Sequence, residues 1–412
     1  MAIKIMLWIP FIITICTAHY TSGFNFERDE NMQAIHDISL GINRFTVELH
    51  KIISRNVKSF VISPLSVALV LMMAACGADG ENAEEMKSVL HFDSDNSVHR
   101  TGIHSMLEMF NAIQTSEVKM ANRMYIKKGI KIYPDYVNLI KTTFNSSIEN
   151  VEFENCAETA QAINQWCAEQ THQRIEKIID PNDIDQETML ILVNAVYFKA
   201  LWSSAFEKSD TNLKTFHLNK FETKEVPMMW QSIETSYGVL SESNATFVRL
   251  RFKSNYVYEY LNMIVMLPNE IDGLDIIENN LHKLEPSAVK GTRCLVRLFL
   301  PKFKMENKFD LTVPLNQMGM VTPFQDNANF SRMSKKPLEM KIAKIVQKTI
   351  FEVNEKGVEA VAATQATLNF RFGKGYNPYL KKVDFVVNRP FMYLITNKNT
   401  ILFSGKVTDP DY

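Results

Sequence analysis

One long segment of the sequence, residues 355–389, contains residues that a second protein could act on. It begins with small residues, Glu-Lys-Gly-Val-Glu-Ala-Val-Ala-Ala-Thr at 355–364, and continues with Gly, Asn, Pro and aromatic residues. A loop this long inside a compact domain is usually functional or disordered. The segment is therefore either a flexible surface excursion or a bait that a protease binds in extended form.

The rest of the sequence lacks the motifs of common enzymes. It has no G-x-S-x-G, H-E-x-x-H or G-x-x-x-x-G-K, and no G-x-G-x-x-G before a helix. The nine histidines are scattered, and His99 and His104 have no carboxylate or cysteine companions. Ser63 and Ser66 flank Pro64, where helix capping explains them better than nucleophilic attack. We predict a protein that is not an enzyme, with no catalytic residue, metal or cofactor.

The elements that position this segment are mixed in type. Ser63 and Pro64 predict a helix start, and the apolar run at 67–75 predicts that this helix is buried. Residues 157–179 form a long amphipathic stretch that predicts a further helix. Later apolar, β-rich runs predict strands at 189–198, 260–268, 295–300, 342–353, 385–396 and 400–407. Helices first and strands later indicate an α+β fold, and the absence of a linker indicates one domain.

Composition limits the partners. Of 412 residues, 46% are hydrophobic and 22% charged, as in ordinary globular proteins. The 45 basic and 46 acidic residues leave a net charge of −1, which gives no broad basic face for nucleic acid. We predict a monomer with neither a nucleic-acid nor a membrane partner.

The N-terminus has the layout of a secretory signal peptide. Lys4 precedes an uncharged apolar run at residues 5–16, and small or polar residues follow to residue 23. The run is too short to span a bilayer comfortably. We predict a signal peptide at residues 1–18, with cleavage between 18 and 23, and a secreted, extracellular domain at residues 24–412.

Two further features fit an exported protein. Three Asn-x-Ser/Thr sequons, at Asn145, Asn244 and Asn329, predict a glycoprotein. After removal of the signal, the remaining cysteines are Cys76, Cys156, Cys167 and Cys294, which allow three pairings that the sequence does not rank. Cys76 lies in an apolar run typical of a buried free thiol, whereas Cys156 and Cys167 are close enough along the chain to bridge locally.

Several blocks occur together in a recognisable order. They are residues 56–66, 77–80, 164–166 with Thr171, 192–202, 301–303, 318–319, 330–331, 389–391 and 403–407. This ordered set resembles the serpin family over nearly the whole mature chain. The resemblance implies three β-sheets, about nine helices and an exposed reactive-centre loop, here residues 357 to about 388. In an inhibitory serpin, a target protease is acylated as it cleaves this loop, which then inserts into the largest sheet and distorts the trapped enzyme.

The hinge of the implied loop suits insertion. Side chains alternate in a strand, so if Val358 faces inward, Ala360, Ala362 and Thr364 do too, and all four are small or β-branched and uncharged. Glu359 falls on the opposite face. The hinge residues are Glu355, Gly357, Val358, Glu359, Ala360, Val361, Ala362, Ala363 and Thr364. Inhibitory members usually have Thr or Ser in place of Val358 and Ala in place of Val361.

The resemblance also implies a sheet-opening region at Ser63, Ser66, Asn194 and Gln347. The family often has His where Gln347 stands. Glutamine can also donate and accept hydrogen bonds, so it can replace the histidine in a polar network. Val358 and Gln347 nevertheless keep a second hypothesis open, a non-inhibitory serpin that binds a ligand or a partner.

The family's usual spacing from Gly357 places the scissile bond between Arg371 and Phe372. An arginine there suits a trypsin-like protease, whose buried carboxylate pairs with a guanidinium. The loop is longer than usual, so Lys374 is a competitor, as are Lys381 and Lys382. Phe370 or Phe372 before the bond would instead suit a chymotrypsin-like pocket. The first hypothesis is therefore a secreted serine-type endopeptidase inhibitor of a trypsin-like target. The stretch at 99–117, where heparin-binding members are basic, has only Arg100 among Lys and Arg, so heparin is not an expected partner.

Overall fold

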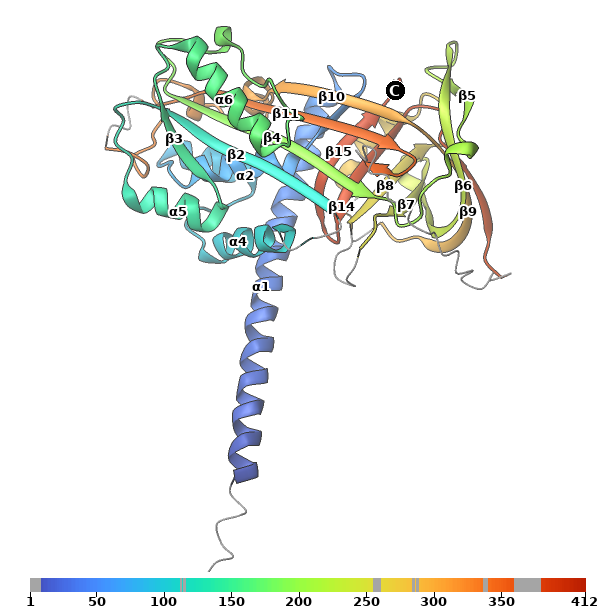
Figure 1. The fold of residues 1–412 in the computed structure, drawn as a ribbon, viewed down its shortest axis with the longest axis horizontal. Helices are drawn as coiled ribbons and strands as arrows, with labels where there is room; N and C mark the ends of the chain where they lie inside the picture. The colour runs from blue at the N-terminus through green and yellow to red at the C-terminus, as the bar shows by residue number, and fades with distance from the viewer. Residues whose placement is uncertain are drawn as a thin grey trace, which may run out of the picture.

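The computed structural model describes residues 9–111, 113, 116–254, 261–283, 286, 289–335, 340–358 and 379–412, with side chains from residue 30 onward. Within these ranges the chain forms eight α-helices and fifteen strands arranged in two sheets (Figure 1). The predicted α+β class is confirmed.

The helices form mainly in the first half of the chain. Their bounds are α1 (Ile9–Ser54), α2 (Pro64–Ala75), α3 (Glu81–Leu90), α4 (Ser97–Asn111), α5 (Pro134–Phe144), α6 (Cys156–Gln170), α7 (Leu274–Asn279) and α8 (Thr312–Gln317). Ser63 caps α2 and Pro64 begins it, as predicted, and every residue of α2 is buried. The first part of α1 projects from the rest of the molecule (Figure 1), and α1 packs into the core from Ala34 onward. No helix within the described ranges is long and apolar enough to cross a membrane.

The smaller sheet has six strands. In spatial order they are β10 (Phe303–Asp310), β11 (Ile342–Asn354), β12 (Gly357–Val358), β4 (Leu190–Leu201), β2 (Ser116–Lys127) and β3 (Ser147–Val151). The two long central strands, β4 and β11, also pair directly and run parallel to each other. Both lie where the apolar runs at 189–198 and 342–353 predicted strands.

The larger sheet has nine strands. Its main path is β1 (Phe60–Ile62), β15 (Thr400–Val407), β14 (Phe391–Asn397), β8 (Leu261–Pro268), β7 (Ala245–Arg251), β6 (Thr223–Leu240), β9 (Thr292–Pro301) and β13 (Lys382–Val386). Strand β5 (Asn212–His217) pairs with β6 outside this path.

The count of two sheets differs from the three that the resemblance implies, and the long strand β6 explains the difference. Its first residues pair with β5, its middle pairs with β9, and its last five residues pair with β7. One strand therefore carries continuous hydrogen bonding from one set of strands to another. Three sheets and nine helices are thus approximate numbers for this chain.

Two predicted elements are shorter or divided in the structure. The helix predicted over 157–179 ends at Gln170, because His172 and Gln173 have φ of 52° and 62° and Thr171 is the C-cap. The strand predicted over 385–396 is two strands, β13 and β14, separated at Pro390, which has no N–H to donate.

The core lies between the sheets. Helix α2 contacts β2 and β4 on one side and β15 on the other. A second apolar cluster covers the outer face of the six-stranded sheet, where Ile163 of α6 packs with Ile191 and Val193 of β4 and Val346 of β11. Figure 1 shows α6 lying over this sheet. The two central strands are therefore covered on both faces.

Candidate functional site

The candidate site is the line along which β4 and β11 meet, which we call the seam. The two strands pair at eight positions, from Leu190–Ile342 to Tyr197–Ile350, and then diverge. Beyond that point β12 lies between them, where Val358 pairs antiparallel with Val353 on one side and with Ala200 on the other. The sheet is already open by one strand at this end, and the chain entering the opening is the start of the predicted hinge.

A tight turn directs the chain back into the sheet. Asn354 Oδ1 accepts hydrogen bonds from the backbone N–H groups of Lys356 at 3.0 Å and Gly357 at 3.3 Å. Trp202 donates its indole N–H to the Asn354 carbonyl oxygen at 2.9 Å and its backbone N–H to the Lys356 carbonyl oxygen at 2.9 Å. Both hydrogen-bond partners of Trp202 belong to the turn. Because Trp202 directly follows β4, the end of this strand fixes where the hinge begins.

Gly357 and Val358 occupy the opening without spare room. A Cβ atom on Gly357 would lie 2.0 Å from the carbonyl oxygen of Ala200, and φ at Gly357 is 157°. The close approach to β4 requires glycine here. Val358 is fully buried, with an exposed fraction of 0%. Val358 therefore faces inward, as the predicted alternation of hinge side chains requires.

Glu355 anchors the turn from the side. Its carboxylate accepts a hydrogen bond from Thr211 Oγ1 at 3.0 Å and pairs with Lys302 Nζ at 3.2 Å. The Lys302 ammonium also lies 3.7 Å from the ring centre of Tyr412. Burial raises the pKa of Glu355, but hydrogen bonds from its own backbone, Thr211 and Lys302 outweigh burial, so the net pKa is lowered. Burial lowers the pKa of Lys302, and its contacts with Tyr412 and Glu355 outweigh burial, so that pKa is raised.

We predict that Glu355→Gln lowers the free energy of unfolding at pH 7 by about 2–3 kcal/mol, because it leaves Lys302 without its carboxylate. A carboxyl group whose pKa is lowered on folding stabilises fully above its unfolded pKa of about 4.3 and loses this contribution as the pH falls through the folded value. The difference between wild type and variant should therefore shrink below about pH 4. Urea unfolding of wild type and variant at pH 7 and pH 3.5 measures this difference in the free energy of unfolding.

Glu352→Gln is the control for this prediction. Glu352 lies near the end of β11, three residues before Glu355, and its carboxylate accepts a hydrogen bond from Asn354. This variant should leave the contacts of Glu355 with Thr211 and Lys302 intact. It should therefore lower the free energy of unfolding at pH 7 by less than Glu355→Gln does. Equal losses for the two variants, or a loss in Glu355→Gln that does not change with pH, would contradict the proposed role of Glu355.

A buried polar network lies in the closed part of the seam. Gln347 Oε1 accepts from the Ser63 backbone N–H at 3.0 Å, and Gln347 Nε2 donates to the Ser63 carbonyl oxygen at 3.0 Å and to Asn194 Oδ1. Asn194 Nδ2 donates to Ser66 Oγ and to Asn122 Oδ1. The structure therefore brings together all four residues predicted for the sheet-opening region, although their role in opening stays a prediction.

Asn122 is the member of this network that sequence reasoning missed. It lies directly opposite Asn194 in the pairing of β2 with β4. A signal was present, because asparagine is depleted in strands and Asn122 interrupts a stretch of strand residues. The hinge contacts Thr211 and Lys302 were also missed, and no local pattern marks them.

The network crosses the seam at one position. Gln347 of β11 and Asn194 of β4 are direct register partners. Both residues also bind the start of α2, Gln347 through its N-cap Ser63 and Asn194 through Ser66 in its first turn. Separating the strands would break the Gln347–Asn194 hydrogen bond and would also pull on these two links to one helix. The arrangement thus holds the seam closed.

We predict that Gln347→Ala lowers the free energy of unfolding by about 2–4 kcal/mol, because it deprives Ser63 and Asn194 of buried hydrogen-bond partners. Chemical unfolding followed by tryptophan fluorescence measures the loss. Gln347→His is the matched variant, since an imidazole can donate and accept, and it should retain most of the stability. If Gln347→Ala is as stable as wild type, the network does not hold the seam.

The structure describes only some of the remaining predicted residues. Glu359, Ala360, Val361, Ala362, Ala363, Thr364, Arg371, Phe372 and Lys374 lie outside the described residues. Among the sequons, Asn145 and Asn244 are exposed at left-handed turns, whereas Asn329 is half-buried. Glycosylation stays a prediction at all three. Cys76, Cys156, Cys167 and Cys294 are free thiols, so the local bridge between Cys156 and Cys167 does not form here.

Comparison with known proteins gives a consistent result. Residues 40–410 match the family model described as "Serpin (serine protease inhibitor)". The "Antitrypsin" of Bombyx mori is 31% identical over 370 residues, which cover 89% of this chain and 92% of that protein.

Two solved structures are similar over nearly the full length. Serpin48, a highly specific serpin of the insect Tenebrio molitor, has a TM-score of 0.82 and 29% identity, covering 91% of this chain and 98% of that one. Human thyroxine-binding globulin, solved with its thyroxine ligand, has a TM-score of 0.79 and 25% identity, covering 92% of this chain and all of that one.

Proposed function

The chain belongs to the serpin family, and on this premise we propose that it is a suicide-substrate inhibitor of a trypsin-like serine protease. The observation that carries the proposal is the position of β12, whose residue Val358 already lies between β4 and β11. Insertion of the cleaved loop would extend this short strand along the seam. The trypsin-like target rests on Arg371 and on similarity to a protein named antitrypsin.

The chemical step is the ordinary acylation of a serine protease. The protease serine oxygen attacks the carbonyl carbon of Arg371, and the peptide bond to Phe372 breaks. The new amine of Phe372 takes the proton that the protease histidine removed from the serine. Arg371 is left as an ester on the protease, and the chain on its N-terminal side is free to move.

Insertion is favourable for reasons that the described strands supply. The seam closes by a parallel pairing of eight positions, and parallel pairing is slightly less stable per residue than antiparallel pairing. Each inserted residue would form antiparallel ladders with both β4 and β11, in the manner of Val358. Residues 358–371, extended at about 3.3 Å each, would carry the attached protease more than about 40 Å along the sheet.

Thermal unfolding before and after cleavage of the loop tests this proposal. Insertion adds buried strand pairing, so we expect the midpoint of the cleaved form to rise by more than about 10 °C. A protein whose loop is cleaved without inserting should keep its original midpoint. That outcome would remove the basis for a suicide inhibitor.

The second candidate function is that of a non-inhibitory serpin that binds a ligand. The specific observations that favour it are Val358 and Gln347, which depart from the usual inhibitory residues, and the similarity to a globulin solved with thyroxine. Cleavage without stabilisation would favour this candidate. Two features support inhibition instead, the small or β-branched, uncharged residues predicted to face inward in the hinge and the intact polar network around Gln347.

We also propose that the protein is secreted, on the basis of the N-terminal layout. The mature protein should begin between residues 19 and 24. Its mass should exceed that of the polypeptide by the glycans at the occupied sequons. Intact mass spectrometry before and after enzymatic removal of N-linked glycans measures both.

A further inference from the structure

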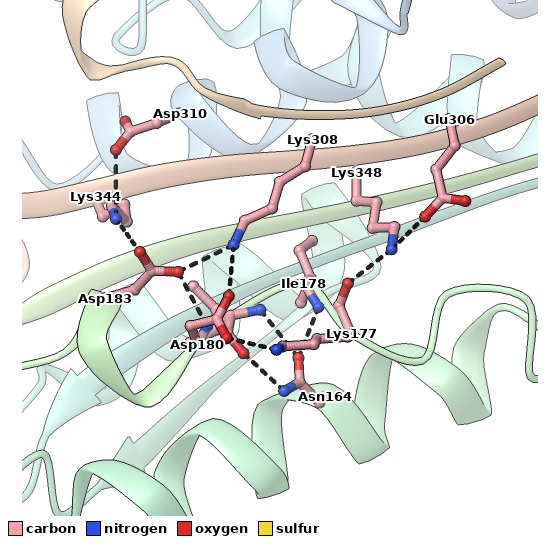
Figure 2. A network of polar contacts seen from close by, with 11 residues as sticks. Asn164, Lys177, Ile178, Asp180, Asp183, Glu306, Lys308, Asp310, Lys344 and Lys348 are labelled. Carbon is pink, nitrogen blue, oxygen red and sulfur yellow. Dashed lines mark hydrogen bonds and ion pairs between the residues drawn. The ribbon is translucent and has the colours of Figure 1, made fainter.

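The segment that joins α6 to β4, residues 171–189, lies across the outer face of the six-stranded sheet. We call it the α6–β4 connection. It contains a short 3-10 helix, Pro181–Asp183. Figure 2 shows Asp180 and Asp183 of the connection turned toward Lys308 of β10 and Lys344 of β11. The connection does not belong to the hinge or to the polar network described above.

Ion pairs join the connection to β10 and β11. Asp183 lies 2.6 Å from Lys344 Nζ and 3.0 Å from Lys308 Nζ, and Asp180 lies 3.5 Å from Lys308 Nζ. Lys348 Nζ donates to the Lys177 carbonyl oxygen at 3.0 Å. Lys308 and Lys348 are direct cross-strand partners, and like charges placed opposite each other are destabilising. The connection thus shares this basic face with two carboxylates of β10, since Asp310 lies 3.5 Å from Lys344 Nζ and Glu306 lies 2.6 Å from Lys348 Nζ.

Apolar packing and helix α6 also hold the connection over the sheet. Ile178 and Ile179 are fully buried in the cluster that includes Ile191 of β4 and Val346 of β11. Asn164 of α6 accepts the backbone N–H groups of Ile178 at 2.7 Å and Ile179 at 3.0 Å, and donates to the Ile179 carbonyl oxygen at 2.8 Å. These contacts tie the connection to α6.

Helix α6 is in turn fixed to β2. The Arg123 guanidinium lies 4.4 Å from the ring of Trp166, and Tyr125 makes an edge contact with the same ring. The connection therefore straddles the seam: its apolar cluster reaches both β4 and β11, α6 ties it to β2, and its ion pairs join it to β10 and β11. Inserting a strand separates β4 from β11 by one more strand spacing, about 4.8 Å. Ion pairs of 2.6–3.5 Å cannot survive that displacement unless the connection shifts.

We propose that Asp183, through its ion pairs with Lys344 and Lys308, is a positioning residue that latches the seam and sets the rate of loop insertion. The inference rests on the proposed function, because it concerns the step that follows cleavage. An acylated protease is trapped only if insertion precedes hydrolysis of the ester. Asp183 thus controls the share of encounters that ends in a trapped complex.

The surroundings of Asp183 support a strong latch. The side chains of Asp183 and Lys344 have exposed fractions of 21% and 22%, so water screens them less than it screens ordinary surface pairs. Partial burial raises the pKa of Asp183, but Lys344, the Asp180 backbone N–H and Lys308 outweigh it and hold the pKa well below its usual value. Asp183 therefore stays ionised, and its loss destabilises the closed sheet more than the opened one.

The test uses the full-length protein and a fluorescent peptide with the sequence of residues 358–371, which can anneal into the seam without any protease. We expect Asp183→Asn to accelerate annealing about tenfold. Added salt should accelerate wild type more than the variant, because only wild type has the pairs to be screened. The charge exchange Asp183→Lys with Lys344→Asp should slow annealing again relative to Asp183→Lys alone. A merely structural role would give neither the salt effect nor the rescue.

Asp272→Asn is the matched control, since it removes an ion pair with Lys220 that lies away from the six-stranded sheet. It should anneal at the wild-type rate. If Asp183→Asn does not fold, Lys344→Gln serves as the second variant. Equal rates for wild type and the Asp183 and Lys344 variants, or equal acceleration by Asp272→Asn, would overturn the latch while leaving the proposed function intact. If the peptide does not anneal to wild type, the proposed function fails and the latch fails with it.

Discussion

Replacing Val358 by arginine should turn the protein from an inhibitor into a substrate. Val358 is fully buried between Val353 and Ala200, so an arginine there must be desolvated or expelled from the sheet. An unpaired buried charge costs about 3–5 kcal/mol. If that cost is felt in full as the strand extends into the sheet, insertion slows by about 10²–10⁴-fold. Ester hydrolysis then precedes trapping, and the protease is released active.

The measurement is the ratio of trapped complex to cleaved product on a denaturing gel at several ratios of inhibitor to protease. Val358→Thr is the matched control, because threonine is β-branched, uncharged and usual at this position in inhibitory members. It should form complex as wild type does. Undiminished complex formation by Val358→Arg would show that inhibition does not require an uncharged residue 358 buried between β4 and β11.

Replacing Arg371 by alanine should abolish inhibition of a trypsin-like protease. The binding pocket of such a protease carries a buried carboxylate, and a site built for a charged partner rejects an analogue that lacks it by about 10⁴-fold. The association rate constant with trypsin, measured under pseudo-first-order conditions, should fall by that order. The association rate constant of Arg371→Lys should fall less, because lysine still supplies a positive charge.

Lys374→Ala is the control that separates the two candidate scissile bonds. If the bond lies after Arg371, Lys374→Ala should inhibit trypsin at nearly the wild-type rate. If Lys374→Ala loses inhibition and Arg371→Ala does not, the bond lies after Lys374 in the lengthened loop.

The sequence predicts those parts of the fold that local patterns encode. The pair Ser63–Pro64 correctly predicts the start of α2, and the apolar runs at 189–198 and 342–353 correctly predict the two central strands. The order of the sequence blocks correctly indicates the family, which the family model over residues 40–410 confirms. Local patterns fail where chain direction changes within an apparently continuous stretch, as at Thr171 after α6 and at Pro390 between β13 and β14.

The candidate site is only partly predictable for a related reason. Ser63, Ser66, Asn194 and Gln347 were predicted through the resemblance, and they meet in one network. Contacts between segments far apart in the chain have no local signature. The anchor of Glu355 on Lys302 and Tyr412 and the ion pairs of Asp183 are of this kind, since each depends on the register of strands that only the folded sheet establishes.

Incubation with trypsin, followed by denaturing gel electrophoresis and mass spectrometry, tests the central claim most directly. If the protein traps the acylated protease, we expect a complex that survives denaturation at nearly the summed mass of the two proteins. We also expect the release of a C-terminal peptide that begins at Phe372. Complete cleavage after Arg371 with no complex, and with no rise in the thermal midpoint of the cleaved protein, would contradict the claim that this chain inhibits by inserting its loop between β4 and β11.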